Sequence, residues 1–305
     1  MKQSNLHVTC VPSDTHFGEF CSHSDVAGIR MNGILFKNVD LASQLAKLPE
    51  RCSVPLWFDA KGRQLRVEES INFPDHLELV MNHQITGLTL PHPIIFKAGE
   101  DWAMIERIEG KRLILRADGF PKYRVKPGDS VHLRNPKAKI VGPLFTVDEK
   151  EKIQQAVRSG AENWYLSYAE HPKDVDEFRE LIGRHAQLTL KIESLRGLQL
   201  VAMLPSPDLK GFRLACARGD LYVEVEQPHH IVEAEKLIIE RDPDALVGSR
   251  MLLSLFNNST PSCSDVNEIL FLKSLGYKHF LLCDDLCKSG PALHRAVDTF
   301  TAIMR

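Results

Sequence analysis

Charged side chains stand at the ends of two predicted strands, where they could bind an ion or a small molecule. The strand-like run Gln187–Glu193 ends in Lys191-Ile192-Glu193, and strand alternation places Lys191 and Glu193 on the same side. The next predicted strand ends in Ala217-Arg218-Gly219-Asp220, where the backbone N–H groups of a turn could hold a substrate anion. Glu193 and Asp220 then supply two carboxylates from adjacent strands. With water and substrate oxygens, they make a site suited to Mg²⁺ or Mn²⁺.

Each of these features has a simpler interpretation when it is taken alone. A Lys-x-Glu sequence at a strand end is often a solvated pair, and Gly-Asp is common in turns. Their joint placement at neighbouring strand ends favours a binding site, provided that the fold brings the strand ends together.

The order of strands and helices predicts such a fold. Helical spacing of apolar residues predicts helices at Asp148–Gly160, Asp174–Gly183, Pro228–Arg241, Ser264–Gly276 and Pro291–Met304. Strand-like runs cover Leu6–Val11, Ala27–Gly33, Pro55–Ala60, Asn163–Tyr168, Gln187–Glu193, Gly211–Ala217, Ala245–Ser249 and Lys278–Asp284. This α/β pattern predicts a (β/α)8 TIM barrel, a fold of roughly 250 residues whose active sites lie at the carboxyl ends of the strands.

The alternation of strands and helices breaks in the middle of the chain. Short β-like runs separated by Gly, Pro and Asn cover His76–Met81, Ile94–Lys97, Trp102–Ile108, Arg112–Arg116 and Ser130–Leu133. We therefore predict a small all-β domain at residues 62–142, inserted after strand 3, with the barrel formed by residues 1–61 and 143–305. An insertion of this kind could act as a lid that excludes water from the barrel mouth.

Short motifs at several strand ends occur in the order found in a known enzyme family. They are Arg30-Met31-Asn32, Asp59-Ala60-Lys61-Gly62, Lys191-Ile192-Glu193 with Gly197, Ala217-Arg218-Gly219-Asp220-Leu221 with Val223-Glu224, Gly248-Ser249-Arg250-Met251-Leu252, and Pro261–Val266. This series resembles the pyruvate kinase family over nearly the whole chain. The resemblance implies the same barrel, and the insertion falls where that family carries its lid domain.

The resemblance also implies a role for each candidate residue. Arg30 and Lys191 would be catalytic, with Arg30 holding the phosphoryl group and Lys191 stabilising charge on the phosphoryl and enolate oxygens. Glu193 and Asp220 would bind Mg²⁺ or Mn²⁺. Candidates for substrate binding are Arg218, Gly219, Asp220, Ser249, Asn32, Lys61 and Arg66. The set is chemically coherent, since an enolate and a transferring phosphoryl group both need fixed positive charge.

Some positions depart from the family pattern. Of the family's potassium ligands, Asn32 and Asp59 remain, but Ile34 and Ala60 replace hydroxyl residues, so we expect K⁺ to activate little or not at all. On the nucleotide side, Leu35 replaces a histidine and Cys283-Asp284-Asp285-Leu286 replaces Ser-Gly-Glu-Thr. The sequence ends shortly after the eighth helix, so we expect neither the family's C-terminal regulatory domain nor allostery by sugar phosphates.

Composition and charge limit the partners. A formal net charge of −2 gives no general attraction to nucleic acid or to anionic membranes. The N-terminus does not resemble a signal peptide, and apolar runs are far shorter than the roughly 20 residues of a spanning helix. Seven scattered cysteines indicate reduced thiols. We expect a cytoplasmic protein with a small-molecule substrate, phosphoenolpyruvate or a 2-oxo acid, that could form a homo-oligomer.

Three functional classes remain open. The leading hypothesis is an enzyme that uses phosphoenolpyruvate or makes the pyruvate enolate, with phosphoryl transfer to ADP or another acceptor. A metal-dependent carbon–carbon lyase, an aldolase or decarboxylase of a 2-oxo acid, would fit the altered nucleotide side. The third class is a non-catalytic binding protein. The joint presence of Lys191, Glu193 and Asp220 argues against this class.

Overall fold

The predicted barrel is present in the computed structural model, which describes residues 5–32, 48, 52–116, 121–204 and 211–305. Within these residues, eight parallel strands close into a barrel in the order β1-β16-β15-β14-β13-β12-β3-β2. Their residues are mostly buried, as expected for parallel strands covered by helices. The strands are β1 (Leu6–Thr9), β2 (Gly28–Asn32), β3 (Leu56–Ala60), β12 (Asn163–Leu166), β13 (Gln187–Ile192), β14 (Phe212–Ala217), β15 (Leu246–Gly248) and β16 (His279–Leu281).

Helices follow most of the barrel strands. The side chains of Thr146 and Ser262 accept hydrogen bonds from backbone N–H groups in the first turns of α3 and α8, which fixes where these helices begin. The helices are α1 (Phe17–Phe20), α3 (Val147–Arg158), α4 (Pro172–Ile182), α5 (Leu195–Met203), α6 (Arg218–Glu224), α7 (Ile231–Arg241), α8 (Cys263–Ser274), α9 (Asp284–Cys287) and α10 (Gly290–Met304), with 3₁₀ turns η2 (Lys97–Gly99), η4 (Pro228–His230) and η5 (Leu253–Phe256).

The middle of the chain forms antiparallel sheets, which we call the β unit (strands β4 to β11). One sheet has the order β10-β7-β8-β9-β5-β4, and β11 pairs with β6. The strands are β4 (Val67–Asn72), β5 (His76–Met81), β6 (Gln84–Thr86), β7 (His92–Phe96), β8 (Asp101–Glu109), β9 (Arg112–Arg116), β10 (Val131–His132) and β11 (Lys139–Val141). The β unit has its own apolar core, separate from that of the barrel.

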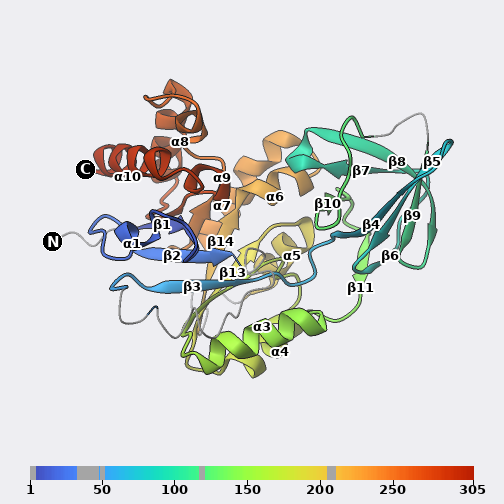
Figure 1. The fold of residues 1–305 in the computed structure, drawn as a ribbon, viewed down its shortest axis with the longest axis horizontal. Coiled ribbons are helices and arrows are strands. Elements are labelled where there is room, and N and C mark those ends of the chain that lie inside the picture. Colours follow the sequence, from blue (N-terminus) through green and yellow to red (C-terminus); the bar gives the residue numbers. More distant parts are fainter. Residues whose placement is uncertain (1–4, 33–47, 49–51, 117–120, 205–210) are drawn as a thin grey trace.

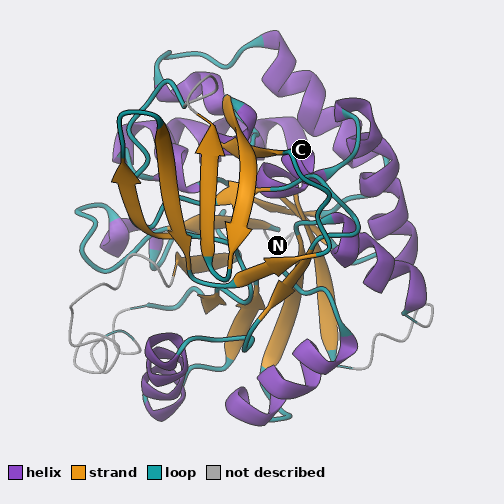
Figure 2. Cartoon of the chain, turned by 90° about the vertical axis from the view of Figure 1, so that its right-hand side faces the viewer, coloured by secondary structure: helices purple, strands orange, loops and turns teal. Residues whose placement is uncertain are grey.

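The β unit contacts the barrel at the carboxyl ends of its strands. Nε of Arg134 donates to the carbonyl of Val223 in α6 at 2.8 Å, and Nδ1 of His132 lies 3.0 Å from Oε1 of Glu224. Figure 1 shows the barrel at the left and the β unit at the right, and Figure 2 shows the chain from the β-unit side. This position suits the predicted lid, and the lid function and the domain boundaries stay predictions.

Sequence patterns located the long elements better than the short ones. The predicted strand 245–249 shortens to Leu246–Gly248, the helix predicted from Pro228 begins as η4, and Gly33 of the predicted second strand lies outside the described residues. We did not predict β4, β6, β11 or α5.

Within the described residues, no helix is long and apolar enough to cross a membrane.

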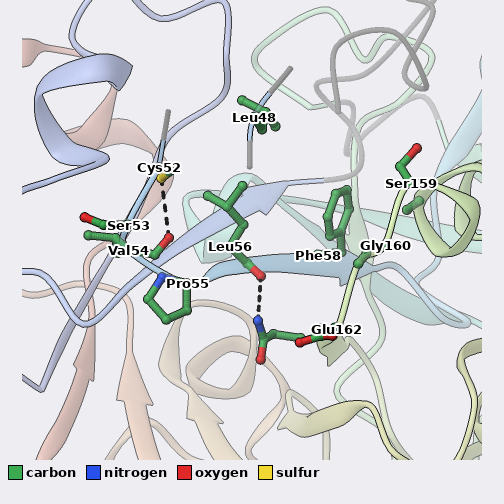
Figure 3. A pocket seen from close by; sticks show the side chains of 13 residues that line it. Leu48, Cys52, Ser53, Val54, Pro55, Leu56, Phe58, Ser159, Gly160 and Glu162 are labelled. Atoms are coloured by element: carbon green, nitrogen blue, oxygen red, sulfur yellow. Dashed lines mark hydrogen bonds between the residues drawn. The ribbon is translucent and has the colours of Figure 1, made fainter. Parts of the chain in front are cut away.

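Figure 3 shows a pocket at the opposite end of the barrel, beside the amino ends of β3 and β12. Leu56, Phe58 and Leu48 make part of its wall, and Nδ2 of Asn163 donates to the carbonyl of Leu56 at 3.1 Å. Among the described residues that line it, Glu162 alone carries a charge. Because barrel active sites lie at the carboxyl ends of the strands, this pocket is not where an active site is expected.

Candidate active site

A cavity of about 470 Å³, which we call the mouth cavity, opens at the carboxyl ends of the barrel strands. Asn32, Gln64, Ser167, Gly219 and Ser249 are among its polar and small lining residues. Of the described residues, five basic and five acidic side chains also line it: Arg30, Lys61, Arg66, Lys191 and Arg250, with Glu100, Glu193, Asp220, Asp284 and Asp285. The fold therefore brings nearly all predicted site residues to one place.

Lys191 is buried and held by three side chains. Its Nζ lies 2.9 Å from Oε1 of Glu193 and 3.2 Å from Oδ2 of Asp59, and it donates to Oγ of Ser167 at 2.8 Å. The contact with Glu193 puts both side chains on the same side of the chain at the end of β13, as alternation predicts. Burial alone would lower the pKa of Lys191, but Asp59 and Glu193 outweigh it and raise the pKa. Lys191 is therefore a charged ammonium at neutral pH.

Arg30 is held by carboxylates from two other strand ends. Its Nη2 lies 2.6 Å from Oδ2 of Asp59, and its Nη1 lies 2.8 Å from Oδ1 of Asp284. Burial would raise the pKa of Asp59, but Lys191 and Arg30 together hold it well below its ordinary value. Asp59 thus links the two predicted catalytic cations, a role that we did not predict for it.

Two residues that we did not predict from the sequence complete this network. Oγ of Ser167 donates to Oδ1 of Asp59 at 2.8 Å, and the backbone N–H of Tyr168 donates to Oε2 of Glu193 at 2.8 Å. Tyr168 has a φ of 51°, a left-handed conformation that is uncommon outside glycine and is often found at functional sites. Both residues follow β12 directly, and their place at a strand end is the signal that could have identified them.

Lys61 and Arg66 add positive charge to the mouth cavity. Burial lowers the pKa of Lys61 to about 8, although Asp59 opposes this change. Arg66 donates to Oε1 of Gln64 and to the carbonyl of Gly128, which fixes its guanidinium beside the cavity. Lys61 can therefore lose its charge at mildly alkaline pH.

Asp220 lies in the first turn of α6, and the turn that we predicted from Gly-Asp is wrong. Strand β14 ends at Ala217 and α6 begins at the next residue, so no turn separates the strand from the helix. Oδ2 of Asp220 accepts from Nε2 of Gln64 at 3.1 Å. A Cβ on Gly219 would lie 3.3 Å from Oγ of Ser249, so glycine permits the close approach of these two residues.

Arg218 does not line the mouth cavity in the described part of the chain. Its Nε lies 2.7 Å from Oε1 of Glu235 in α7, and its Nη2 pairs with Glu268 in α8. The side chain is therefore an anchor that joins α6 to two outer helices. Direct binding of substrate by Arg218 has no support in this geometry.

Asn32 lies in the cavity wall, where its Nδ2 donates to Oδ2 of Asp284 at 2.9 Å. Asp284 belongs to the segment that departs from the family pattern, and here it binds both Asn32 and Arg30. Ile34 and Leu35 lie outside the described residues. The expectations for potassium and for the nucleotide that depend on them stay predictions.

His132 brings the β unit to the edge of the site. Its Nε2 lies 3.7 Å from Oδ1 of Asp220, while its Nδ1 faces Glu224 at 3.0 Å. Burial alone would lower the pKa of His132, but the hydrogen bond with Glu224 and the charge of Asp220 raise it. A residue of the β unit thus contacts one of the two predicted metal ligands.

Glu193 and Asp220 fit a divalent-metal site. Both line the mouth cavity, and their oxygens are the ligands that Mg²⁺ and Mn²⁺ prefer. Burial raises the pKa of Glu193, Lys191 opposes this, and the negative charge of Asp220 adds to the rise. A cation between the two carboxylates would offset their repulsion.

Proteins of known function with similar sequences include several pyruvate kinases. The enzyme of Methanocaldococcus jannaschii is 21% identical over 262 residues, which cover 80% of this chain and 56% of that protein. That of Thermoplasma acidophilum is 24% identical over 266 residues, with 76% and 44% covered. That of Dictyostelium discoideum is 22% identical over 282 residues, with 83% and 54% covered. The chain is related to the pyruvate kinase family.

The relationship to pyruvate kinases confirms the resemblance read from the strand-end motifs. The chain spans about half the length of the curated pyruvate kinases that it matches. No protein-family profile matches the sequence. The family relationship therefore supports the fold and a kinase-like enzyme, and the reaction itself is a matter for proposal.

Proposed function

We propose that this chain is a pyruvate kinase-like enzyme that acts on phosphoenolpyruvate or the pyruvate enolate, with phosphoryl transfer as the favoured reaction. The observation that carries this proposal is the buried ammonium of Lys191 beside Glu193, in a cavity that also contains Asp220 and Arg30. This arrangement supplies fixed positive charge and a pair of carboxylates. It suits electrostatic stabilisation of a small anionic substrate better than attack by a nucleophilic side chain.

The balance of charges in the mouth cavity supports a role for a divalent metal. Among the described residues, the five basic side chains are matched by five acidic ones. A multiply charged anion therefore gains little net attraction from the protein alone. We propose that Glu193 and Asp220 hold Mg²⁺ or Mn²⁺, which when bound supplies positive charge to polarise substrate oxygens.

The remaining roles follow from how the side chains are held. Ser167, Asp59 and Glu193 fix the Lys191 ammonium, so it needs little reorganisation to stabilise an enolate oxygen. Asp59 and Asp284 orient the Arg30 guanidinium, which we propose contacts the phosphoryl group. Gly219 and Ser249 would bind the substrate carboxylate at the first turn of α6.

The phosphoryl acceptor can be tested directly. Protein, Mg²⁺ and phosphoenolpyruvate would be mixed with ADP and with other acceptors, and the reaction followed by phosphorus NMR. We expect the phosphoenolpyruvate signal to disappear with at least one acceptor. Phosphoenolpyruvate that stays intact with every acceptor would contradict phosphoryl transfer and favour a carbon–carbon lyase.

The enolate step has a separate test. With Mg²⁺ and phosphate present, we expect the protein to exchange the methyl protons of pyruvate with D₂O faster than buffer does. Lys191→Met should slow this exchange. Two variants serve as controls: Lys191→Arg keeps the positive charge at this position, and Lys278→Met changes an exposed lysine far from the cavity. Exchange that is no faster than buffer in folded, metal-loaded protein would overturn the enolate chemistry.

A cytoplasmic location is also part of the proposal. All seven cysteines are free thiols, as in proteins of a reducing compartment.

A further inference from the structure

The loop between β1 and α1 gathers three possible metal ligands outside the mouth cavity. Cys10, Asp14 and His16 each present one ligand atom, and these three atoms lie within 4.8 Å of one another. In the part of the chain that the structure describes, no other group of three His, Cys, Asp or Glu side chains meets this condition. The donors are a sulfur, a carboxylate oxygen and an imidazole nitrogen, which is a mixture typical of zinc sites.

Backbone groups orient two of these side chains as they would for a metal. Nε2 of His16 lies 2.9 Å from the carbonyl oxygen of Cys287, and because a carbonyl can only accept, Nε2 must carry the proton. The lone pair of the neutral ring is then on Nδ1. The backbone N–H of Val11 donates to Oδ2 of Asp14 at 2.8 Å. Metal-binding histidines and carboxylates are commonly held by such hydrogen bonds.

Burial and access also suit an ion. Cys10 and His16 are 1% and 6% exposed, so water competes little for them. Asp14 is half-buried between the exposed residues Ser13 and Thr15, which leaves a path from solvent to the group. A buried thiol, a buried imidazole and an accessible carboxylate can thus enclose an ion that enters from one side.

We propose that Cys10, Asp14 and His16 form a transition-metal site, with Zn²⁺ as the ion that this donor set fits best. The ion would take Sγ of Cys10, Nδ1 of His16 and one oxygen of Asp14, and water would complete a tetrahedron. Cys10 binds as a thiolate and releases its proton to solvent. This sulfur-containing site differs in chemistry from the Glu193–Asp220 pair and does not depend on the proposed function.

Such a metal would stabilise one wall of the barrel mouth. Oγ1 of Thr9, next to Cys10, accepts from Nη1 of Arg30 at 3.3 Å, and the backbone N–H of Thr9 donates to Sγ of Cys287 at 3.3 Å. His16 contacts the carbonyl of the same Cys287. The ion would thus fix His16, whose hydrogen bond reaches the end of α9, and Cys10, which is next in sequence to the Thr9 that Arg30 contacts.

Cobalt provides a spectroscopic test. Reduced, metal-free protein would be titrated with Co²⁺, and the thiolate-to-cobalt charge-transfer absorption in the near ultraviolet would be measured. We expect a band that saturates at one ion per chain and is bleached by Zn²⁺. Cys10→Ser should abolish the band, and Cys263→Ser, which changes an exposed thiol on α8, should retain it.

Further variants keep the test decisive. Asp14→Asn and His16→Gln retain the thiol and should weaken cobalt binding roughly tenfold or more. Glu193→Gln with Asp220→Asn should leave the band unchanged, which separates this site from the proposed active site. Folding of each variant would be checked by circular dichroism. Absence of the band in folded wild-type protein would overturn the proposal, as would a band that persists in Cys10→Ser or is unaffected in both Asp14→Asn and His16→Gln.

Discussion

At the level of single residues, the candidate site depends on buried ion pairs whose members fix each other's position. Asp59 is almost completely buried, yet it remains ionised because Lys191 and Arg30 both contact it. The two cations in turn keep fixed positions because Asp59 lies between them. Removal of any one member would leave the others buried without their partner, which is costly in a protein interior.

The low pKa of Lys61 leads to a prediction about pH. Burial lowers this pKa to about 8, so the ammonium loses its proton as pH rises through that value. Positive charge in the mouth cavity then falls, and we expect the affinity for phosphate or phosphoenolpyruvate to decrease above about pH 8. Calorimetric titrations between about pH 6.5 and pH 9.5 would measure this, since that range spans the shifted pKa and stays below the ordinary lysine pKa of about 10.4. In Lys61→Arg the decrease should be much smaller, and an equal decrease in this variant would exclude Lys61 as its cause.

Asp220 leads to a prediction about the metal. Mg²⁺ demands near-octahedral oxygen coordination, so Asp220→Ala should weaken its binding by about tenfold or more. Isothermal titration calorimetry with Mn²⁺ and Mg²⁺ would measure the change. Asp244→Ala, an exposed aspartate at the other end of the barrel, is the matched control. Unchanged affinity in Asp220→Ala would place the metal elsewhere.

Among the elements, α6 shows what the sequence could and could not predict. Alternation along β13 was enough to place Lys191 and Glu193 together, because that relation is local. The sequence Arg218-Gly219-Asp220 looked like a turn because glycine and aspartate are typical of turns. It is instead the start of α6, where Arg218 pairs with Glu235 of α7 and Glu268 of α8, and a local pattern does not indicate such distant partners. The link from Lys191 to Asp59 spans 132 residues, and no local pattern indicates it.

Strands of the β unit also show which elements a sequence pattern can predict. The apolar alternation of β5 made it predictable, because alternate side chains of His76–Met81 are buried. Strand β4 has mostly polar or half-exposed residues, and β6 has only three residues, so neither produces a clear pattern. Such strands are fixed by pairing with neighbours rather than by their own composition.

The position of Arg218 predicts a structural effect of its replacement. Arg218→Met would leave Glu235 buried without its cation, and we expect a loss of about 3–5 kcal/mol in the free energy of unfolding. Urea denaturation would measure it. Adding Glu235→Gln should recover part of the loss, because it removes the buried charge. Full stability in Arg218→Met, together with weaker substrate binding, would instead support the substrate-binding role.

Across the whole molecule, two apolar cores are joined by a polar interface. The barrel core and the β-unit core form separate clusters. Between them lie polar contacts such as Arg134 with the carbonyl of Val223, and Arg63 with Asp174 at 2.6 Å. Polar interfaces of this kind permit one part of a chain to move or to open while the other stays folded.

We therefore predict that a destabilising substitution in the β-unit core affects the β unit and leaves the barrel unchanged. Leu79 is fully buried in that core, and Leu79→Ala should cost about 2–5 kcal/mol. Hydrogen exchange measured by mass spectrometry should become faster in β5, β8 and β9 and remain unchanged in β12 and β13. Leu190→Ala, a fully buried residue of the barrel core, is the matched control and should accelerate exchange in the barrel strands. If Leu79→Ala accelerated exchange equally in both parts, the two cores would form one cooperative unit, and a β unit that moves independently over the mouth cavity would be excluded.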